Sequence, residues 1–211
     1  MGKFKPIFDS LSEAALRGAR HADAKLPQLA RNHGDQLDDW VRRVRGEDRF
    51  DDKPDDASRT DAVTTTRGRN AKTTVYDTDS GRPVYEDGKI LEDFGGGKRG
   101  DNATAIGRLG NKGDDGGHLG AHRFFGDTPD QGIVPQIANL NRGAWKRMEN
   151  HWAQLVQGGA QVDYSIDVFP PGSIRPERFD VHYIVSDPET GDIISEHTPS
   201  FPNEHGATFT P

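Results

Sequence analysis

The chain has 211 residues, of which 32% are hydrophobic and 29% are charged, and it contains no cysteine. Disulfide bonds and thiolate catalysis are therefore excluded, and a metal site would have to use His, Asp, Glu or Asn, which favours hard cations over structural zinc. No run of 18 apolar residues occurs, so no membrane-spanning segment is expected. The N-terminus lacks the basic and then apolar pattern of a signal peptide.

The net charge of -7 is concentrated at one end of the chain. Residues 161–211 carry 2 basic and 9 acidic groups, whereas residues 106–160 carry 6 basic and 5 acidic groups. A polyanion could approach the middle of the chain, but this charge alone does not predict nucleic-acid binding.

Residues 1–46 are expected to form a helical hairpin. Ser10 and Glu13 fit a capping box at the start of the first helix. The second helix should run from about residue 35 to Gly46, with apolar residues at helical spacing. We interpret this hairpin as a packing appendage, or alternatively as a docking or delivery segment that would make the chain an interaction protein. Residues 47–70 are polar and are predicted to be a linker, which leaves 71–211 as the main domain.

The main domain is predicted to be α+β with an antiparallel sheet. Residues 73–76 and 84–85 are predicted to form a hairpin around the turn at Asp79-Ser80-Gly81. Apolar and polar residues alternate over 162–168 and 179–185, which is typical of half-buried strands, and a third strand should follow at 193–194. The end of the chain is expected to be loose. The loop at 94–100, FGGGKRG, lacks the helix and Lys-Ser/Thr of a phosphate-binding loop.

The stretch Gly113–Trp152 carries the candidate functional residues, and the rest of the domain is interpreted as its support. Its second half predicts a long helix, on which an angular step of 100° per residue places Trp145, Met148 and Trp152 on one buried face. Asn141 falls in the middle of that face and Glu149 at its edge. The buried amide of Asn141 needs partners. It could bond a neighbouring backbone group, or its carbonyl oxygen could bind a cation.

His118 lies among four glycines, which suits a bent strand bordering a cleft. It could be a polar surface residue or a functional one. A zinc pair with His122 would require a helix, which the glycine content argues against. Hydrolysis of a phosphodiester needs a base, a cation at the phosphate and a positive group for the transition state. His118, an ion held by Asn141 and an arginine could supply these three functions.

The motifs DDGGH, VPQ and LNRGAWKRME together resemble the DNA/RNA non-specific endonuclease family, a branch of the ββα-metal nucleases. More closely, they resemble the C-terminal nuclease domains of bacterial polymorphic and type VII-secreted toxins. The resemblance covers about residues 98–185. It implies that His118 is the general base, that Asn141 binds Mg²⁺ (which Mn²⁺ can replace), and that Glu149 positions a water molecule of that ion.

Two positions depart from the family pattern. The arginine of the family's D-R-G-H motif is Gly116 here, so another residue must stabilise the transition state. Arg123 is the first candidate, followed by Arg108 and Arg142. A second asparagine, nine residues before the metal-binding one, is Gly132 here, and Asp130 or Asn139 could replace it. The substrate-binding candidates are Arg142, Arg147 and Lys112.

The sequence therefore predicts a ββα-metal nuclease domain, with His118 on the strand and Asn141 on the helix. We expect a Mg²⁺-dependent endonuclease that cleaves DNA or RNA with little sequence preference. The resemblance further implies an antibacterial effector that is delivered into the cytoplasm of a target cell and is neutralised by a cognate immunity protein. The alternative is a non-catalytic binding module that retains the ββα fold after losing the Gly116 arginine.

Overall fold

The computed structural model describes residues 60–211. The helical hairpin expected at 1–46 and the first part of the linker expected at 47–70 lie outside the described residues. Within residues 60–211, no helix has the length and hydrophobicity needed to cross a bilayer.

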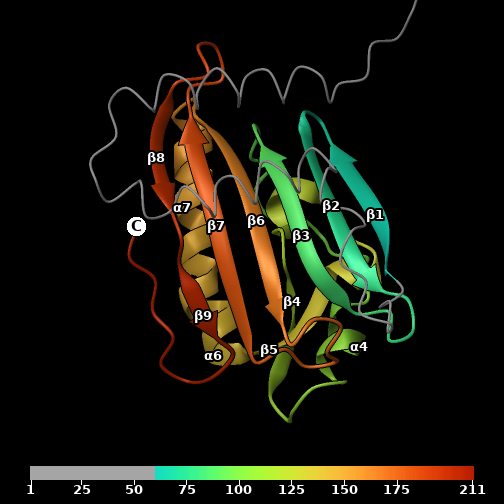
Figure 1. Cartoon of the computed structure of the whole chain (residues 1–211). Coiled ribbons are helices and arrows are strands. Elements are labelled where there is room, and N and C mark those ends of the chain that lie inside the picture. The colour runs from blue at the N-terminus through green and yellow to red at the C-terminus, as the bar shows by residue number, and fades with distance from the viewer. Residues whose placement is uncertain (1–59) are drawn as a thin grey trace, which may run out of the picture. The chain divides into compact units, whose positions relative to one another are not determined.

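An antiparallel sheet of seven strands forms one layer of the domain (Figure 1). The strand order is β1-β2-β3-β6-β7-β8. The short β9 also pairs with β7, next to the part of β7 that pairs with β8. The strands are β1 (Thr60–Arg67), β2 (Asn70–Asp77), β3 (Pro83–Ile90), β6 (Gln161–Phe169), β7 (Arg178–Ser186), β8 (Ile193–His197) and β9 (Ser200–Pro202). The predicted fold class, the hairpin at β2–β3 and the three later strands are confirmed.

A long helical segment covers one face of this sheet (Figure 1). It consists of α6 (Ala138–Leu140), a π-helical turn (Asn141–Trp145) and α7 (Lys146–Gln157). Trp145, Met148 and Trp152 are fully buried, as their spacing predicts, and they pack against the apolar faces of β6 and β7. Burial of each such side chain stabilises the fold by roughly 1.5–3 kcal/mol.

A second, two-stranded sheet precedes this helical segment. It pairs β4 (Asp114–His118) with β5 (Ile133–Ile137) in antiparallel register, with His118 opposite Ile133. The short helix α5 (His122–Phe125) and a 3₁₀ turn (Asp130–Gly132) connect the two strands. The helix α4 (Ala103–Gly107) packs on β4. The strands β4 and β5 and the helix that follows them form the expected ββα unit.

Two segments differ from the prediction. The strand β1 lies inside the stretch expected to be a linker, and it pairs along its whole length with β2. As an edge strand it is polar and largely exposed, so it has no apolar alternation. The C-terminal segment, expected to be loose, contributes the buried rings of Phe201 and Phe209 to the core. Phe201 contacts Trp145 with 5.2 Å between ring centroids, and the Asn203 side chain bonds the backbone of β5.

Candidate active site

A cleft of about 750 Å³ lies where β4, the loop before α4 and the start of the long helical segment meet. The structure brings six of the predicted site residues to its walls: Arg108, His118, Arg123, Asn141, Arg142 and Glu149. Lys112 and Arg147 are exposed and do not line the cleft. The two proposed replacements for the missing asparagine, Asp130 and Asn139, do not line the cleft either. Asp130 accepts a hydrogen bond from Asn102, and Asn139 accepts one from the Gly206 amide.

His118 is the last residue of β4 and is almost completely buried. Its carbonyl oxygen accepts a hydrogen bond from the indole of Trp145 at 3.1 Å, which fixes its backbone to the helix. Its Nε2 lies 2.8 Å from Oδ2 of Asp101. Burial lowers the pKa of His118 to about 4 although Asp101 opposes the change, so the imidazole is neutral at neutral pH.

Asp101 is the ionised partner in this pair. Burial raises its pKa, but the hydrogen bond from His118 and bonds from backbone amides outweigh burial and lower the pKa below its ordinary value. A carboxylate can only accept hydrogen bonds. The Nε2 atom of His118 therefore carries the proton, and its Nδ1 atom, which has no hydrogen-bond partner within residues 60–211, keeps its lone pair.

Asn141 begins the π-helical turn and donates a hydrogen bond from Nδ2 to Oδ2 of Asp115 at 3.0 Å. Arg142 bonds the same carboxylate through Nε at 2.7 Å and Nη2 at 2.6 Å. These bonds lower the pKa of Asp115 despite its partial burial, and the bond from Arg142 has the largest effect. Because Nδ2 is held by Asp115, the carbonyl oxygen of Asn141 is available to a ligand, and no partner for it occurs within residues 60–211.

The helical wheel placed Asn141 in the middle of the buried face, but the residue is only half-buried and lines the cleft. The reason is the π-helical turn at Asn141–Trp145, in which hydrogen bonds span one more residue than in an α-helix. A step of 100° per residue therefore fails between Asn141 and Trp145.

Glu149 follows two turns later and is buried beside the cleft. Burial raises its pKa, and this effect is opposed chiefly by Lys146, whose Nζ lies 3.1 Å from Oε2. Glu149 and the carbonyl of Asn141 are oxygen donors of the kind that Mg²⁺ prefers. These two side chains can therefore contribute to a site for a hard divalent cation.

Arg123, the first candidate for the catalytic cation, is already engaged. Its Nε and Nη2 atoms bond the nearly buried carboxylate of Asp93 at 2.8 and 2.7 Å, and its Nη1 bonds Asn150 at 2.8 Å. This pairing, above all the hydrogen bond to Asp93, raises the pKa of Arg123 further. Three of its five donors are thus committed to protein groups.

Arg99 is a cleft residue that the sequence interpretation missed. It is exposed, lines the cleft and has no ion pair with any residue in the described range 60–211. Its charge lowers the pKa values of Asp115, His118 and Glu149, although it is not the largest influence on any of them. The signal in the sequence is the basic pair Lys98-Arg99 inside FGGGKRG, a loop that does not match the phosphate-binding pattern.

Gly116, the position of the family's arginine, is covered by backbone. A Cβ atom added there would overlap the carbonyl oxygen of Ala103 at the start of α4. A Cβ atom on Gly107, at the other end of α4, would lie 2.5 Å from the Gly116 nitrogen. No arginine side chain can leave β4 at this point, because α4 occupies the space.

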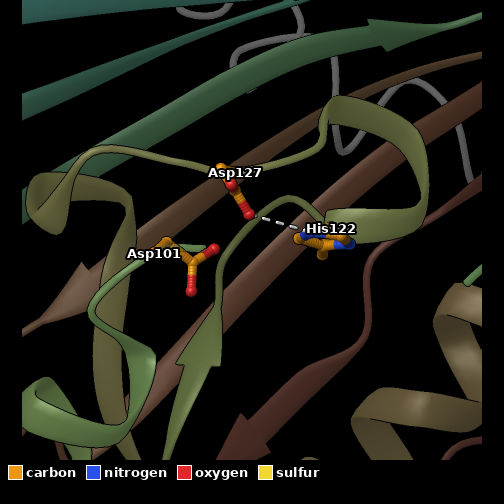
Figure 2. A group of neighbouring side chains, drawn as sticks. All are labelled: Asp101, His122 and Asp127. Carbon is orange, nitrogen blue, oxygen red and sulfur yellow. Dashed lines mark hydrogen bonds and ion pairs between the residues drawn. The ribbon is translucent and has the colours of Figure 1, made fainter. Parts of the chain in front are cut away.

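A second group of polar side chains lies beside His118. Asp101, His122 and Asp127 each offer one ligand atom, and these atoms lie within 4.8 Å of one another (Figure 2). However, Asp127 already accepts hydrogen bonds from His122 at 3.1 Å and from the Gly100 amide at 2.8 Å. Asp101 is committed to His118. The group therefore serves to join the loop before α4 to the loop after α5.

Comparison with known proteins gives the following matches. Residues 63–186 match the family described as DNA/RNA non-specific endonuclease. The structure of the EndoG/EndoGI complex is 15% identical, with 70% of this chain and 77% of that chain covered and a TM-score of 0.47. NucA from Streptococcus agalactiae with magnesium bound is 15% identical, with coverage of 74% and 76% and a TM-score of 0.49.

Proposed function

Because the chain belongs to the DNA/RNA non-specific endonuclease family and is a nuclease hydrolase, we propose that it cleaves DNA or RNA with little sequence preference in the cleft beside His118. One observation carries this proposal. The neutral imidazole of His118, the available amide oxygen of Asn141 and the carboxylate of Glu149 line a single cleft. Arg99 and Arg108, which have no ion pair within residues 60–211, line the same cleft.

His118 acts as the general base in this proposal. It is neutral at neutral pH, and its Nδ1 lone pair can take a proton from the attacking water. The bond from Trp145 to the His118 carbonyl holds the end of β4 against the helix. The base is thus carried by packed secondary structure, which preserves its position during the reaction.

A divalent cation, Mg²⁺ or in its place Mn²⁺, fits the donors opposite the base. Asn141 would hold it through the carbonyl oxygen that Asp115 leaves unbonded, and Glu149 would orient water around it. When bound, such an ion stabilises negative charge on the phosphate and on the departing 3′ oxygen. The chain contains no cysteine and so offers no thiolate ligand, which agrees with a hard cation.

Cationic side chains support binding of the polyanionic substrate. Five basic and three acidic side chains line the cleft. We assign stabilisation of the transition-state charge to Arg99 and then to Arg108, which line the cleft, because donors of Arg123 are used by Asp93 and Asn150. Arg142, Arg147 and Lys112 remain candidates for contacts with neighbouring phosphates of the substrate.

The biological role that we propose follows from the resemblance of the DDGGH and LNRGAWKRME motifs to polymorphic-toxin nucleases. In this role the chain is an antibacterial effector that acts on nucleic acid in the cytoplasm of a target cell. A cognate immunity protein protects the producing cell. Expression inside a bacterium tests the toxic role: wild type should reduce viability and His118→Ala should not, and equal growth of both would contradict it.

The nuclease proposal is tested by incubating plasmid DNA or RNA with the purified chain and Mg²⁺. Wild type should degrade the nucleic acid, a chelator should prevent this, and His118→Ala should lose the activity. His182→Ala is the matched control, because His182 lies on β7, outside the cleft, where it bonds Glu196. If wild type and His118→Ala leave the substrate equally intact, the chain does not use this site for cleavage.

A further inference from the structure

A buried polar contact beside the cleft, which the proposed mechanism does not use, joins Asp101 to His118. Their side chains are 2% and 3% exposed, and Oδ2 and Nε2 lie 2.8 Å apart. Asp101 precedes α4, whereas His118 ends β4, so the contact joins two separate elements. Such a short bond between a carboxylate and a buried imidazole fixes both the ring orientation and the position of its proton.

Asp101 is itself held in place by the surrounding backbone. It accepts a hydrogen bond from the Ala103 amide at 3.3 Å. The preceding residue, Gly100, donates its amide to Asp127 at 2.8 Å. Downstream, the close contact of Gly116 with Ala103 holds the start of α4 on β4. The carboxylate is therefore oriented before any substrate binds.

We propose that Asp101 is a positioning residue for His118, which holds the imidazole in the tautomer whose Nδ1 accepts the proton of the attacking water. This inference rests on the proposed nuclease function. The proton moves from the water oxygen to Nδ1, and the remaining hydroxide forms its bond to phosphorus as the bond between phosphorus and the 3′ oxygen breaks. The 3′ oxygen leaves with the electron pair of that bond and takes a proton from water, while the Nε2 proton stays in its bond to Asp101. When the ring becomes an imidazolium, the Asp101 carboxylate stabilises the new charge through a charge-assisted hydrogen bond.

The neighbouring histidine offers a natural comparison. His122 also bonds a carboxylate, that of Asp127, at 3.1 Å, but the Asp127 side chain is 54% exposed. Solvent screens the exposed Asp127 carboxylate, so its bond constrains the His122 imidazole less. Like Asp101→Asn, the substitution Asp127→Asn removes one negative charge from the group that joins the loop before α4 to the loop after α5. Unlike Asp101→Asn, it leaves the partner of His118 in place. It is therefore the matched control for Asp101→Asn.

The test reads the tautomer of His118 directly, by ¹⁵N NMR of the labelled full chain near neutral pH. The chain has 8 histidines, and the His118 signals are assigned by their loss in His118→Gln. Wild type should show a protonated Nε2 and an unprotonated Nδ1, and so should Asp127→Asn. Asp101→Asn should show the other tautomer or a mixture. A wild-type ring protonated on Nδ1, or a spectrum unchanged in Asp101→Asn, overturns the proposal.

Kinetics provide the second measurement. Asp101→Asn should lower kcat by about 10- to 100-fold, as loss of an orienting partner does at other sites, with KM unchanged. Asp101→Glu, which keeps the carboxylate, should recover part of both the NMR signature and kcat. An equal loss of kcat in Asp101→Asn and Asp127→Asn would indicate a disturbed loop and contradict a specific role. The NMR result requires no activity, so it separates failure of this inference from failure of the proposed function.

Discussion

Gly116 of β4 and Ala103 of α4 are in direct backbone contact, and no side chain fits at position 116. Gly107 approaches the same strand from the other end of the helix. Two glycines thus allow α4 to lie flat on β4. The consequence for the site is that the segment before α4 reaches the cleft, with Asp101 at the imidazole of His118 and Arg99 at the wall.

Gly116→Ala should therefore destabilise the domain. The added methyl group would overlap the Ala103 carbonyl, and overpacking of this kind costs about 1–3 kcal/mol. Urea unfolding measures the effect. Gly143→Ala is the control, because its Cβ would meet nothing nearer than an Arg147 nitrogen at 3.9 Å. Its stability should be unchanged or slightly higher, since alanine favours a helix. Equal stability of Gly116→Ala and wild type would contradict the contact described.

The fold could be predicted wherever burial imposes a period on the sequence. The strands β6 and β7 each bury alternate residues against α7, so their apolar alternation is visible. In contrast, β1 is an exposed edge strand, and its pairing with β2 uses backbone hydrogen bonds that carry no side-chain signal. The C-terminal rings, Phe201 and Phe209, were missed because single apolar residues between prolines have no period.

The site could be predicted only where local motifs mark it. His118, Asn141 and Glu149 belong to short patterns and lie together in the cleft. Asp101 contacts His118 across 17 residues, and Arg123 is bound by Asp93 across 30 residues. No spacing rule within one element predicts such pairs, because they depend on how α4 and the loop before it pack. For this reason the sequence alone pointed to Arg123 and missed Arg99.

The buried ion pair beneath the site gives a second stability prediction. The Lys72 ammonium lies 3.1 Å from Glu86, with both side chains completely buried, and it also contacts the Gly120 carbonyl. Lys72→Met should lower the free energy of unfolding by about 3–5 kcal/mol, because it leaves the Glu86 charge buried without its counter-ion. The exposed pair of Arg178 and Asp180 supplies the control, and Arg178→Met should cost no more than about 1 kcal/mol. Similar costs for the two variants would contradict the buried pair.

Stability should depend on pH through His118. Burial lowers its pKa from 6.5 to about 4 in the folded chain. Below pH 6.5 the unfolded chain binds a proton that the folded chain does not accept until about pH 4. The contribution of the neutral ring is therefore fully present above pH 6.5 and is lost as the pH falls toward 4, by an amount on the order of 3 kcal/mol.

His118→Gln isolates this effect from that of the other histidines, because glutamine does not titrate. The difference in unfolding free energy between wild type and variant should shift in favour of the variant as the pH is lowered from neutral to about 4.5. Denaturant unfolding at the two pH values measures the shift. A difference that stays constant would mean that His118 titrates equally in the folded and unfolded chains.

Substitution of Arg99 should lower activity without affecting stability, whereas substitution of Arg123 should lower stability. Arg99 is exposed and has no ion pair within residues 60–211, so Arg99→Ala should leave the unfolding free energy unchanged. Loss of one charge-stabilising donor should lower kcat by about 100-fold. Arg123→Ala should instead lower the unfolding free energy by about 3 kcal/mol, because Asp93, which is 4% exposed, would lose its counter-ion.

Plasmid cleavage and urea unfolding of the two purified variants make this comparison, and Arg99→Lys serves as the control that keeps the charge. Lysine should recover only part of kcat, because its ammonium lacks the planar fork that matches a phosphate. If Arg123→Ala loses turnover at unchanged stability while Arg99→Ala retains it, the sequence-based choice of Arg123 is correct. In that case the ion pair with Asp93 must open when substrate binds, since the Arg123 donors are otherwise occupied.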